Sequence, residues 1–431
     1  MFIERLKLKN FKGINEIDLE FDRNVNLIVG VNGVGKSSVL DALRILLTSL
    51  TSRIEGVHQK TRRFNNDYIK NEKDVLEAVI CLRLPNKKIA DWSITRYRKG
   101  STSEIEQSSN HESLNDFVNP LRERLVREKV LGTYHTSVPI VVYYNVHRAY
   151  KSVDDGRSLS ITKVNTTPLS AYENALEPTG TDFESLEKWF GYRYKWHKKS
   201  TNYESQAEDR QLMAVQSAIK SFLPYCTDMW FDEEGSNSLH IKKNSQDFKL
   251  SQMSDGEISL IALVADIARR LAIANPGDVL GSPLDGQGVI LVDEIELHLH
   301  PGWQRKLVKQ FKDTFPKCQF FFTTHSPQVI GHVEPKHIWL FKRMGDDVVA
   351  YRPEKSLGMD SNSILEQLLG VDEREPNTKQ ELEKLAEYIE NDILAEARVL
   401  LAKLTAKCGD IDELRRAKAI IQRKTLLGLD D

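Results

Sequence analysis

A nine-residue segment limits the fold of this chain more than any other part of its sequence. Residues 30–38 read GVNGVGKSS, which satisfies the pattern GxxxxGK[ST]. The segment follows a short apolar run, Val25–Val29, and precedes apolar side chains at helical spacing. Glycines in such a loop let successive backbone N–H groups curl around an anion at a helix N-terminus, where the helix dipole also favours negative charge. The sequence therefore predicts a buried central strand, a phosphate-binding loop and a helix.

This loop supplies most of the expected contacts to a nucleotide. Its backbone would surround the β-phosphate of ATP, the Lys36 ammonium would reach the β- and γ-phosphates, and the Ser37 hydroxyl would ligate Mg²⁺. A chance glycine loop is the alternative, but the strand before it and the helix after it favour a phosphate site. The cofactor-binding residues predicted in this loop are Asn32, Gly33, Gly35, Lys36, Ser37 and Ser38.

A second apolar run ends in two carboxylates. Val289–Val292 predicts a buried strand, and Asp293 and Glu294 follow it directly. Asp293 is expected to hold Mg²⁺ directly or through water, as the second metal residue beside Ser37, and Glu294 to orient and polarise the attacking water. Taken alone, such a run is commonly just the end of a strand. Its place downstream of a phosphate loop favours the catalytic interpretation.

A serine–glycine turn lies between these two motifs. Residues 250–257 read LSQMSDGE and precede a long amphipathic helix. The Ser254 hydroxyl, the Gly256 backbone and the helix N-terminus would form an anion site, and Glu257 belongs to the same turn. Ordinary helix capping also explains the pattern. The position of the turn between the loop and the acidic strand favours nucleotide binding.

A histidine follows the next predicted strand, Cys318–Thr324. His325 is the first residue of the sequence HSP after that strand. A histidine at this place can hydrogen-bond the γ-phosphate and so distinguish ATP from ADP. A lone histidine is usually structural, but the end of a core strand favours this catalytic, sensing role.

In this order, the four motifs resemble those of the ABC-class ATPases of the SMC/RecF group, which includes the OLD-like defence ATPases. The resemblance covers residues 1–60 and 249–345. It implies that two heads close face to face around ATP. In that arrangement Ser254 and Gly256 of one copy meet the γ-phosphate held by Lys36 of the other.

The resemblance also implies that Lys12, in the sequence NFKG, touches the nucleotide. Two positions depart from the pattern of the group. His300, in HLHP, stands where many relatives have aspartate. The strand end that would carry a glutamine reads YYNVHR instead, which leaves Asn145 and His147 as alternatives for a second Mg²⁺ contact.

The expected fold is therefore α/β: an ABC-type ATPase head, with a P-loop mixed sheet and an antiparallel β subdomain, an inserted helical lobe and a C-terminal helical hairpin. Residues 1–110 and 249–350 are expected to form the two halves of the head. The first of these halves is expected to end in an exposed loop at 101–110. Residues 111–248 are expected to form the inserted helical and strand lobe. Residues 351–431 are expected to be a helical region that binds a partner.

The tail shows helical periodicity in two stretches. Thr378 with Glu381 predicts a capping box for a first helix that ends near Gly409. Asp410 with Glu413 predicts the cap of a second helix. Together they predict the helical hairpin.

Composition excludes several classes of protein. No run of 18 apolar residues occurs, so no membrane span is expected, and the charged start does not resemble a signal peptide. Four cysteines without a CxxC pair argue against zinc and disulfides and favour a reducing cytoplasm. The net charge of −2 gives no bulk attraction to nucleic acid.

The tail segment 358–365, GMDSNSIL, and the predicted hairpin resemble PtuA, the ATPase of the Septu and some retron defence systems. Those ATPases lack a Toprim nuclease domain and act with an HNH nuclease, PtuB. The resemblance implies a homodimer or higher oligomer that restrains such a nuclease while ATP is bound. A retron reverse transcriptase and its msDNA are further partners that it implies.

Two alternatives remain open from the residues alone. One is a RecF-like, ATP-gated DNA clamp without a nuclease partner, and the other is an ATP-binding scaffold with negligible turnover. A contact with DNA also depends on residues 188–199, KWFGYRYKWHKK. Aromatic rings that alternate with basic residues are suited to binding single-stranded nucleic acid. A stripe of aromatic residues is more often part of a hydrophobic core, however, so packing within the inserted lobe is the preferred interpretation.

Overall fold

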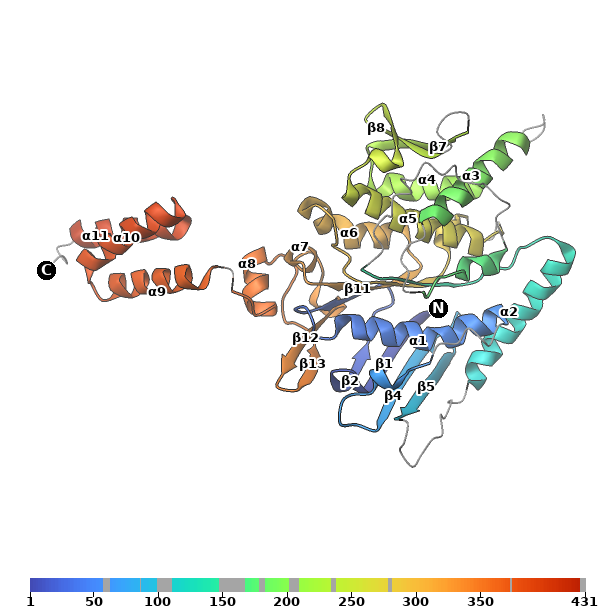
Figure 1. The fold of residues 1–431 in the computed structure, drawn as a ribbon, viewed down its shortest axis with the longest axis horizontal. Coiled ribbons are helices and arrows are strands. Elements are labelled where there is room, and N and C mark those ends of the chain that lie inside the picture. Colours follow the sequence, from blue (N-terminus) through green and yellow to red (C-terminus); the bar gives the residue numbers. More distant parts are fainter. Residues whose placement is uncertain are drawn as a thin grey trace. The chain divides into compact units, whose positions relative to one another are not determined.

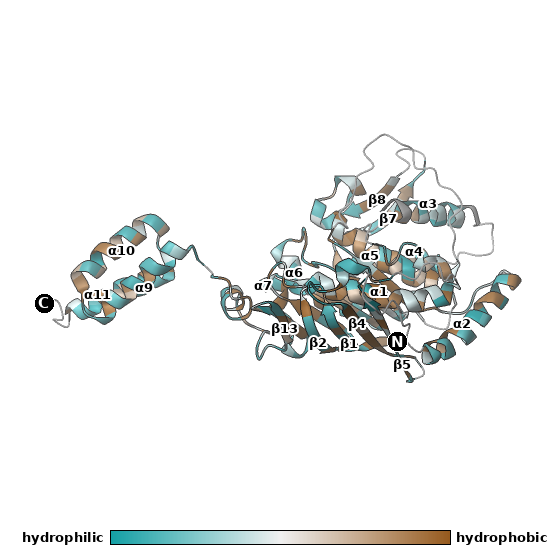
Figure 2. Ribbon diagram, turned by 60° about the horizontal axis from the view of Figure 1, so that its bottom comes forward, coloured by the Kyte–Doolittle hydropathy of each residue, from teal (hydrophilic) through white to brown (hydrophobic). Residues whose placement is uncertain are grey.

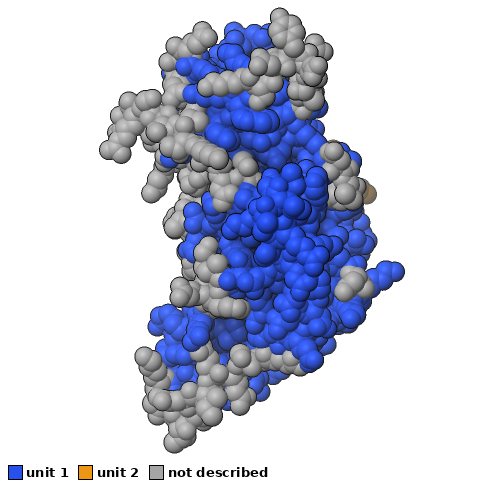
Figure 3. All heavy atoms as spheres, turned by 90° about the vertical axis from the view of Figure 1, so that its right-hand side faces the viewer, with its two compact units in different colours: residues 1–364 blue, residues 365–431 orange. Residues whose placement is uncertain are grey.

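The protein is described from a computed structural model that contains two compact units. The first unit spans Met1–Ile364 and the second Leu365–Asp431, and Figure 3 shows one face of the first. The predicted loop at 101–110 and the predicted contact at His147 lie outside the described residues. The structure describes residues 1–56, 63–85, 87–98, 111–146, 167–177, 183–200, 209–233, 238–277, 281–372 and 374–426.

A six-stranded sheet forms the centre of the first unit, in the order β13-β12-β3-β11-β10-β6. Figure 1 labels its strands β11, β12 and β13. The five strands from β12 to β6 run parallel, and only β13 is antiparallel to its neighbour. The residues of β3, β6, β10 and β11 are all buried, as expected of apolar strands covered on both faces. The strands are β3 (Val25–Val29), β6 (Ile140–Tyr144), β10 (Gly288–Val292), β11 (Cys318–Thr324), β12 (Ile338–Met344) and β13 (Asp347–Tyr351).

An antiparallel sheet of four strands, in the order β2-β1-β4-β5, provides the predicted β subdomain. Its residues alternate between buried and exposed positions, so that one face contributes to the core. Helix α1 (Lys36–Glu55) contacts both this sheet and the central sheet, and α2 (Glu112–Leu131) packs on α1. The strands are β1 (Phe2–Phe11), β2 (Ile14–Glu20), β4 (Val75–Arg83) and β5 (Ile89–Tyr97).

The inserted lobe combines helices with a three-stranded sheet. Helix α4 (Arg210–Phe222) packs on the nearly fully buried helix α5 (Asp255–Ala274), and α3 (Phe183–Ser200) contacts both. In α3, Trp189 and Phe190 are fully buried, which supports the packing interpretation for these two rings, whereas Trp196 is 51% exposed. The strands are β7 (Cys226–Asp232), β8 (Ser238–Lys243) and β9 (Gln246–Lys249).

Short helices complete the first unit. Helix α6 (Pro301–Thr314) follows the acidic strand β10, and α7 (Pro327–Ile330) follows β11. Among the described residues, no helix combines the length and the apolar character that crossing a membrane requires. The remaining short elements are η2 (Asn66–Tyr68), η3 (Pro168–Tyr172), η4 (Leu250–Gln252), η6 (Pro283–Asp285), η7 (Pro335–His337), α8 (Ser361–Ser363) and the π-turn η8 (Ile364–Leu368).

The second unit is a bundle of three helices, so the predicted two-helix hairpin is wrong in detail. The helices are α9 (Pro376–Glu390), α10 (Leu394–Cys408) and α11 (Asp412–Leu426). Each carries hydrophobic and hydrophilic residues (Figure 2). Their shared core consists of Leu385, Ile389, Ala397, Leu404, Leu414, Ala417 and Ile421.

The first tail helix also begins earlier than predicted. Glu375 is the N-cap of α9, and its carboxylate accepts hydrogen bonds from the backbone of Asn377 and Thr378. Glu381 does not reach back to the helix start; it pairs instead with Lys403 of α10 at 2.6 Å. Glutamate is a rarer cap than serine or threonine, so the sequence favours Thr378 as the N-cap.

A buried charge cluster ties helix α5 to strand β6. The Asp266 carboxylate pairs with Arg269 at 2.6 Å and with Arg270 at 2.7 Å, and it accepts a hydrogen bond from the Tyr144 hydroxyl at 2.8 Å. Burial alone would raise the pKa of Asp266, but the two guanidinium groups outweigh it and hold that pKa below its ordinary value. The cluster therefore fixes α5 against the sheet only while Asp266 is ionised.

We predict that Asp266→Asn destabilises the first unit by about 3–5 kcal/mol, because it leaves two buried guanidinium groups without their counterion. Denaturant unfolding of the first unit measures the loss. Tyr144→Phe is the matched control, and it should cost only about 1 kcal/mol, since the ion pairs remain. Because the folded pKa is depressed, the contribution of Asp266 is complete above its ordinary pKa of about 4 and declines below it. The difference between wild type and Asp266→Asn should accordingly shrink as the pH falls below about 4, and a constant difference would contradict the assignment.

Candidate nucleotide-binding site

The loop after β3 has the conformation of a phosphate cradle. Gly33 and Gly35 have positive φ angles of 78° and 104°, which favour glycine. A side chain at Gly30 would meet the carbonyl oxygen of Phe341 at 2.7 Å, so this position also requires glycine. Asn32 and Gly33 are exposed at the tip of the loop, and Ser38 follows in the first turn of α1.

Lys36 lies across the inside of this loop. Its ammonium donates to the carbonyl oxygens of Gly30 at 2.8 Å and Val31 at 3.0 Å. Burial lowers the pKa of Lys36, and the nearby carboxylates of Glu294, Glu296 and Asp293 oppose that effect. A β-phosphate bound in this loop would give the Lys36 ammonium a stronger counter-charge than these carbonyl oxygens do.

Ser37 and Asp293 come together although they stand far apart in the sequence. The Ser37 hydroxyl donates to Asp293 Oδ1 at 3.0 Å, and Thr323, next to the end of β11, donates to the same oxygen. A hydroxyl and a carboxylate are hard oxygen ligands that suit Mg²⁺, which usually completes its shell with phosphates and water. Among the described residues, no group of three or more histidine, cysteine or acidic side chains has an arrangement that could by itself hold a metal ion. With a nucleotide bound, these two oxygens would be the protein ligands of Mg²⁺.

Glu294 is held in an uncommon backbone conformation. Its φ angle is 46°, and its backbone N–H donates to the Thr323 hydroxyl at 2.7 Å. Left-handed conformations of residues other than glycine cost energy and concentrate at functional sites. Thr323 therefore positions the two adjacent acids, Asp293 through its proton and Glu294 through its oxygen.

His325 is paired with an acid that sequence reasoning missed. Its Nδ1 lies 3.1 Å from Glu296 Oε1, and its backbone N–H donates to the same oxygen at 2.8 Å. The Glu296 side chain is 8% exposed and the His325 side chain 46%. The only signal for Glu296 in the sequence is its place two residues after Glu294.

Ser254 is the N-cap of helix α5, which agrees with the helix-capping explanation of this turn, and the residue is exposed. Both its backbone N–H and its hydroxyl donate to Glu257 Oε2, at 3.2 and 2.8 Å. Tyr225 and Lys243 donate to the other oxygen of Glu257 at 2.6 and 2.8 Å. Burial would raise the pKa of Glu257, but these hydrogen bonds hold it below its ordinary value. These four hydrogen bonds of the carboxylate support the turn from within its own chain.

Gly256 connects the turn to the loop that follows the acidic strand. A side chain at Gly256 would meet the carbonyl oxygen of His298 at 2.5 Å. His298 has a positive φ angle of 63°. The turn therefore packs closely against the backbone of this loop, at a position that requires glycine.

Lys12 lies beside helix α1. Its ammonium pairs with Asp41 at 2.8 Å and stands 5.0 Å from the ring centre of Tyr68. Asp41 also accepts from Arg44 at 3.0 Å, one turn further along the helix. Asn145 follows β6 and is 7% exposed. These positions leave the roles implied for Lys12 and Asn145 as predictions.

Comparison with protein families identifies the class of this site. Residues 93–331 match a family described as an AAA domain, and the description also names the AbiEii toxin and a type IV toxin–antitoxin system. The match covers more than half of the chain. The chain belongs to this AAA domain family. Residues 1–133 match a second family, described as a protein of unknown function (DUF2813).

The chain is related to proteins that are named as a retron ATPase and as Septu PtuA. The "Retron Ec83 probable ATPase" of Escherichia coli is 29% identical over 95% of this chain and 84% of that protein. The "Septu protein PtuA" of Bacillus thuringiensis is 22% identical over 86% of this chain and 85% of that protein. Among solved structures, the SmcHead bound to the C-winged helix domain of ScpA aligns with a TM-score of 0.47 and 15% identity, over 82% of this chain and 98% of that one.

His300, which departs from the aspartate of many relatives, has a structural role in this AAA domain. It is the N-cap of α6, and its Nδ1 accepts a hydrogen bond from the backbone of Gly302 at 3.1 Å. Aspartate at the same place could accept that bond as well. The departure therefore preserves the start of α6.

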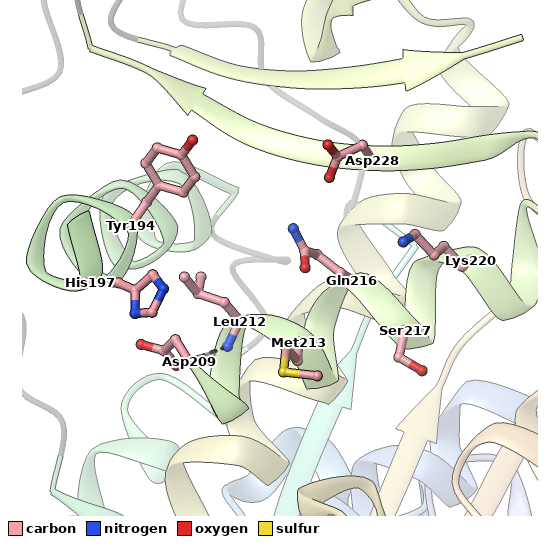
Figure 4. A pocket seen from close by; sticks show the side chains of 9 residues that line it. All are labelled: Tyr194, His197, Asp209, Leu212, Met213, Gln216, Ser217, Lys220 and Asp228. Carbon is pink, nitrogen blue, oxygen red and sulfur yellow. Dashed lines mark hydrogen bonds between the residues drawn. The ribbon is translucent and has the colours of Figure 1, made fainter. Parts of the chain in front are cut away.

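The AAA domain has a cavity of about 570 Å³ in the inserted lobe, apart from the phosphate loop. Figure 4 shows Tyr194 and His197 of α3 facing Gln216 and Lys220 of α4, with Asp228 on the neighbouring strand. Asp209, one of the two acids that line this cavity, caps α4 and pairs with Arg193 at 2.7 Å. This acid thus helps to hold α3 and α4 together.

We predict that Ser37→Ala lowers the affinity for ATP about ten-fold when Mg²⁺ is present, because one metal ligand is lost. Titration calorimetry with a non-hydrolysable ATP analogue, in Mg²⁺ and in EDTA, measures the effect. Ser38→Ala is the comparison on the neighbouring hydroxyl: Ser38 is predicted to bind the nucleotide but not the metal, so any loss that it causes should be the same in Mg²⁺ and in EDTA. Equal losses for the Ser37 variant in Mg²⁺ and in EDTA would show that the hydroxyl does not act through the metal.

Proposed function

We propose that this chain hydrolyses ATP, dimerises around it, and thereby controls a partner HNH nuclease in defence against phage. The observation that carries the proposal is the contact of Ser37 with Asp293, beside Glu294 and His325. Two relatives of this chain are named as a retron ATPase and a Septu protein, and the chain aligns with most of the length of each. This favours a role in defence over a RecF-like DNA clamp.

The hydrolytic roles follow from the chemistry of the assembled groups. Lys36 binds the β- and γ-phosphates, and Ser37 and Asp293 hold Mg²⁺, which neutralises phosphate charge. Glu294 orients water for attack on the γ-phosphate. His325 faces the nucleotide as the residue that distinguishes ATP from ADP.

Dimerisation is supported by what each copy exposes. Asn32 and Gly33 of the phosphate loop are exposed, and so are Ser254 and Asp255 at the start of α5. A phosphate bound between the loop of one copy and the turn of another would receive backbone N–H donors from both. ATP would then join the two heads, and its hydrolysis would release them.

The segment that leads to the second unit rests on α7, the helix that begins just after His325. Gln328 of α7 donates to the Ser361 hydroxyl at 2.6 Å, and Gly358 donates to the carbonyl of Gly331 at 2.9 Å. A displacement of His325 would therefore reach the residues before Leu365. We assign the second unit to binding of the nuclease.

Other partners and the compartment belong to the same proposal. The proposal includes a higher oligomer of heads, a retron reverse transcriptase with its msDNA, and contact with DNA through residues 188–199. The four cysteines are free, which supports the cytoplasm as the place of action.

We predict that Glu294→Gln accumulates a nucleotide-bound dimer, because it keeps ATP binding but removes the base. Size-exclusion chromatography with light scattering, in ATP and in ADP, measures the dimer, and released phosphate measures turnover. Lys36→Ala, which should bind no ATP, is the control that stays monomeric. Unchanged turnover and unchanged assembly in Glu294→Gln would exclude this catalytic assignment.

We predict that a chain ending at Ile364 loses its nuclease partner and keeps its ATP-dependent assembly, because the second unit is compact and separate. Co-purification with the products of neighbouring genes, with and without ATP, tests this. A neighbouring gene set without a nuclease, together with ATP-dependent retention of DNA, would favour the clamp function instead.

A further inference from the structure

Glu296 is a buried carboxylate with no role in the functions assigned so far. It is 7% exposed, and it lies in the segment after strand β10 that also contains Asp293 and Glu294. Its Oε1 faces His325, while its Oε2 has no hydrogen-bond partner in the described part of the chain. Buried charges are normally paired, and an unpaired buried acceptor in a native fold calls for an explanation.

The carboxylate lies in the electrostatic environment of the phosphate loop. Glu296 is one of the three acids whose charge acts on the Lys36 ammonium. A bare anion at this place would repel an incoming γ-phosphate. The His325 ring stands against Glu296 and presents a half-exposed edge, so it can separate the two negative groups.

The contact also decides which nitrogen of His325 is turned outward. A carboxylate beside Nδ1 favours the proton on that nitrogen, and the second nitrogen lies on the other side of the ring. The backbone N–H of His325 donates to the same carboxylate oxygen, so both the residue and its ring are fixed. Ser326 is fixed as well, because its hydroxyl donates to Gln304 at 2.6 Å.

We propose that Glu296 is the positioning residue for His325: it sets the tautomer and orientation in which the outer nitrogen meets the γ-phosphate. The inference rests on the proposed function, in which His325 distinguishes ATP from ADP. Glu296 acts on the discrimination between ATP and ADP through His325 and does not itself contact the nucleotide.

The first test measures nucleotide discrimination in the full-length chain by titration calorimetry with a non-hydrolysable ATP analogue and with ADP, both in Mg²⁺. Glu296→Ala should weaken the analogue about ten-fold and ADP by less than about two-fold, as expected when an orienting carboxylate is removed. Glu296→Gln, which keeps the acceptor, should recover much of the loss. Glu334→Ala is the matched control, since Glu334 is exposed and pairs with Lys336.

A double-mutant cycle then separates positioning from general support of the fold. In the background of His325→Ala, the change Glu296→Ala should no longer weaken binding of the analogue, because the residue that it positions is gone, and removing the bare anion can only leave that affinity unchanged or raise it. Equal losses for both nucleotides, or losses that add to those of His325→Ala, would overturn the proposal.

The second test does not depend on nucleotide. The ¹⁵N spectrum of labelled histidine side chains in the apo protein, with the His325 signal assigned through His325→Ala, should show the proton on Nδ1. Glu296→Ala should shift that signal towards the other tautomer. An unchanged tautomer would refute the proposal even if the chain hydrolyses ATP. If wild type instead binds ATP and ADP equally but Glu296→Ala changes the tautomer, the sensing function fails and the positioning role stands.

Discussion

The site depends on the hydrogen bond between Ser37 and Asp293, which joins residues 256 positions apart in the sequence. No local structure can form this bond. It exists because β3, β11 and β10 are parallel neighbours, so that their carboxyl ends meet at one edge of the sheet. Since β11 lies between the other two strands, Thr323 necessarily stands between the phosphate loop and the acids, where it bonds to Asp293 and Glu294.

The parts of this arrangement that could be predicted are the parts encoded locally. The glycines of the loop predict positive φ angles, which only glycine adopts easily, and Gly33 and Gly35 have such angles. The apolar runs Val25–Val29 and Val289–Val292 predict strands buried on both faces, and all their residues are buried. The order of strands in the sheet could not be predicted, since pairing between distant strands leaves no pattern in either of them.

The residues that sequence reasoning missed share a physical reason. Thr323 and Glu296 act through side-chain contacts with other segments, so their roles appear only when the strands are assembled. The error in the tail has a different cause. The apolar spacing continues through Ile393, but Asp392 has a positive φ angle of 59° and ends the helix there. Adjacent asparagine and aspartate at 391–392 are turn residues, and that signal outweighs the periodicity.

The serine–glycine turn shows that capping and binding are competing uses of one hydroxyl. Ser254 has a single hydroxyl proton, and it goes to Glu257 in the unpaired chain. A phosphate from a second copy would have to take that proton or rely on the backbone N–H groups of the turn. Glu257 would lose little by giving up the hydroxyl, because Tyr225 and Lys243 still bond to its other oxygen. Lys243 also offsets the negative charge of Glu257, which would otherwise repel an arriving phosphate. The interior bonds of the turn therefore keep it formed in one copy while they leave its outer face available to another.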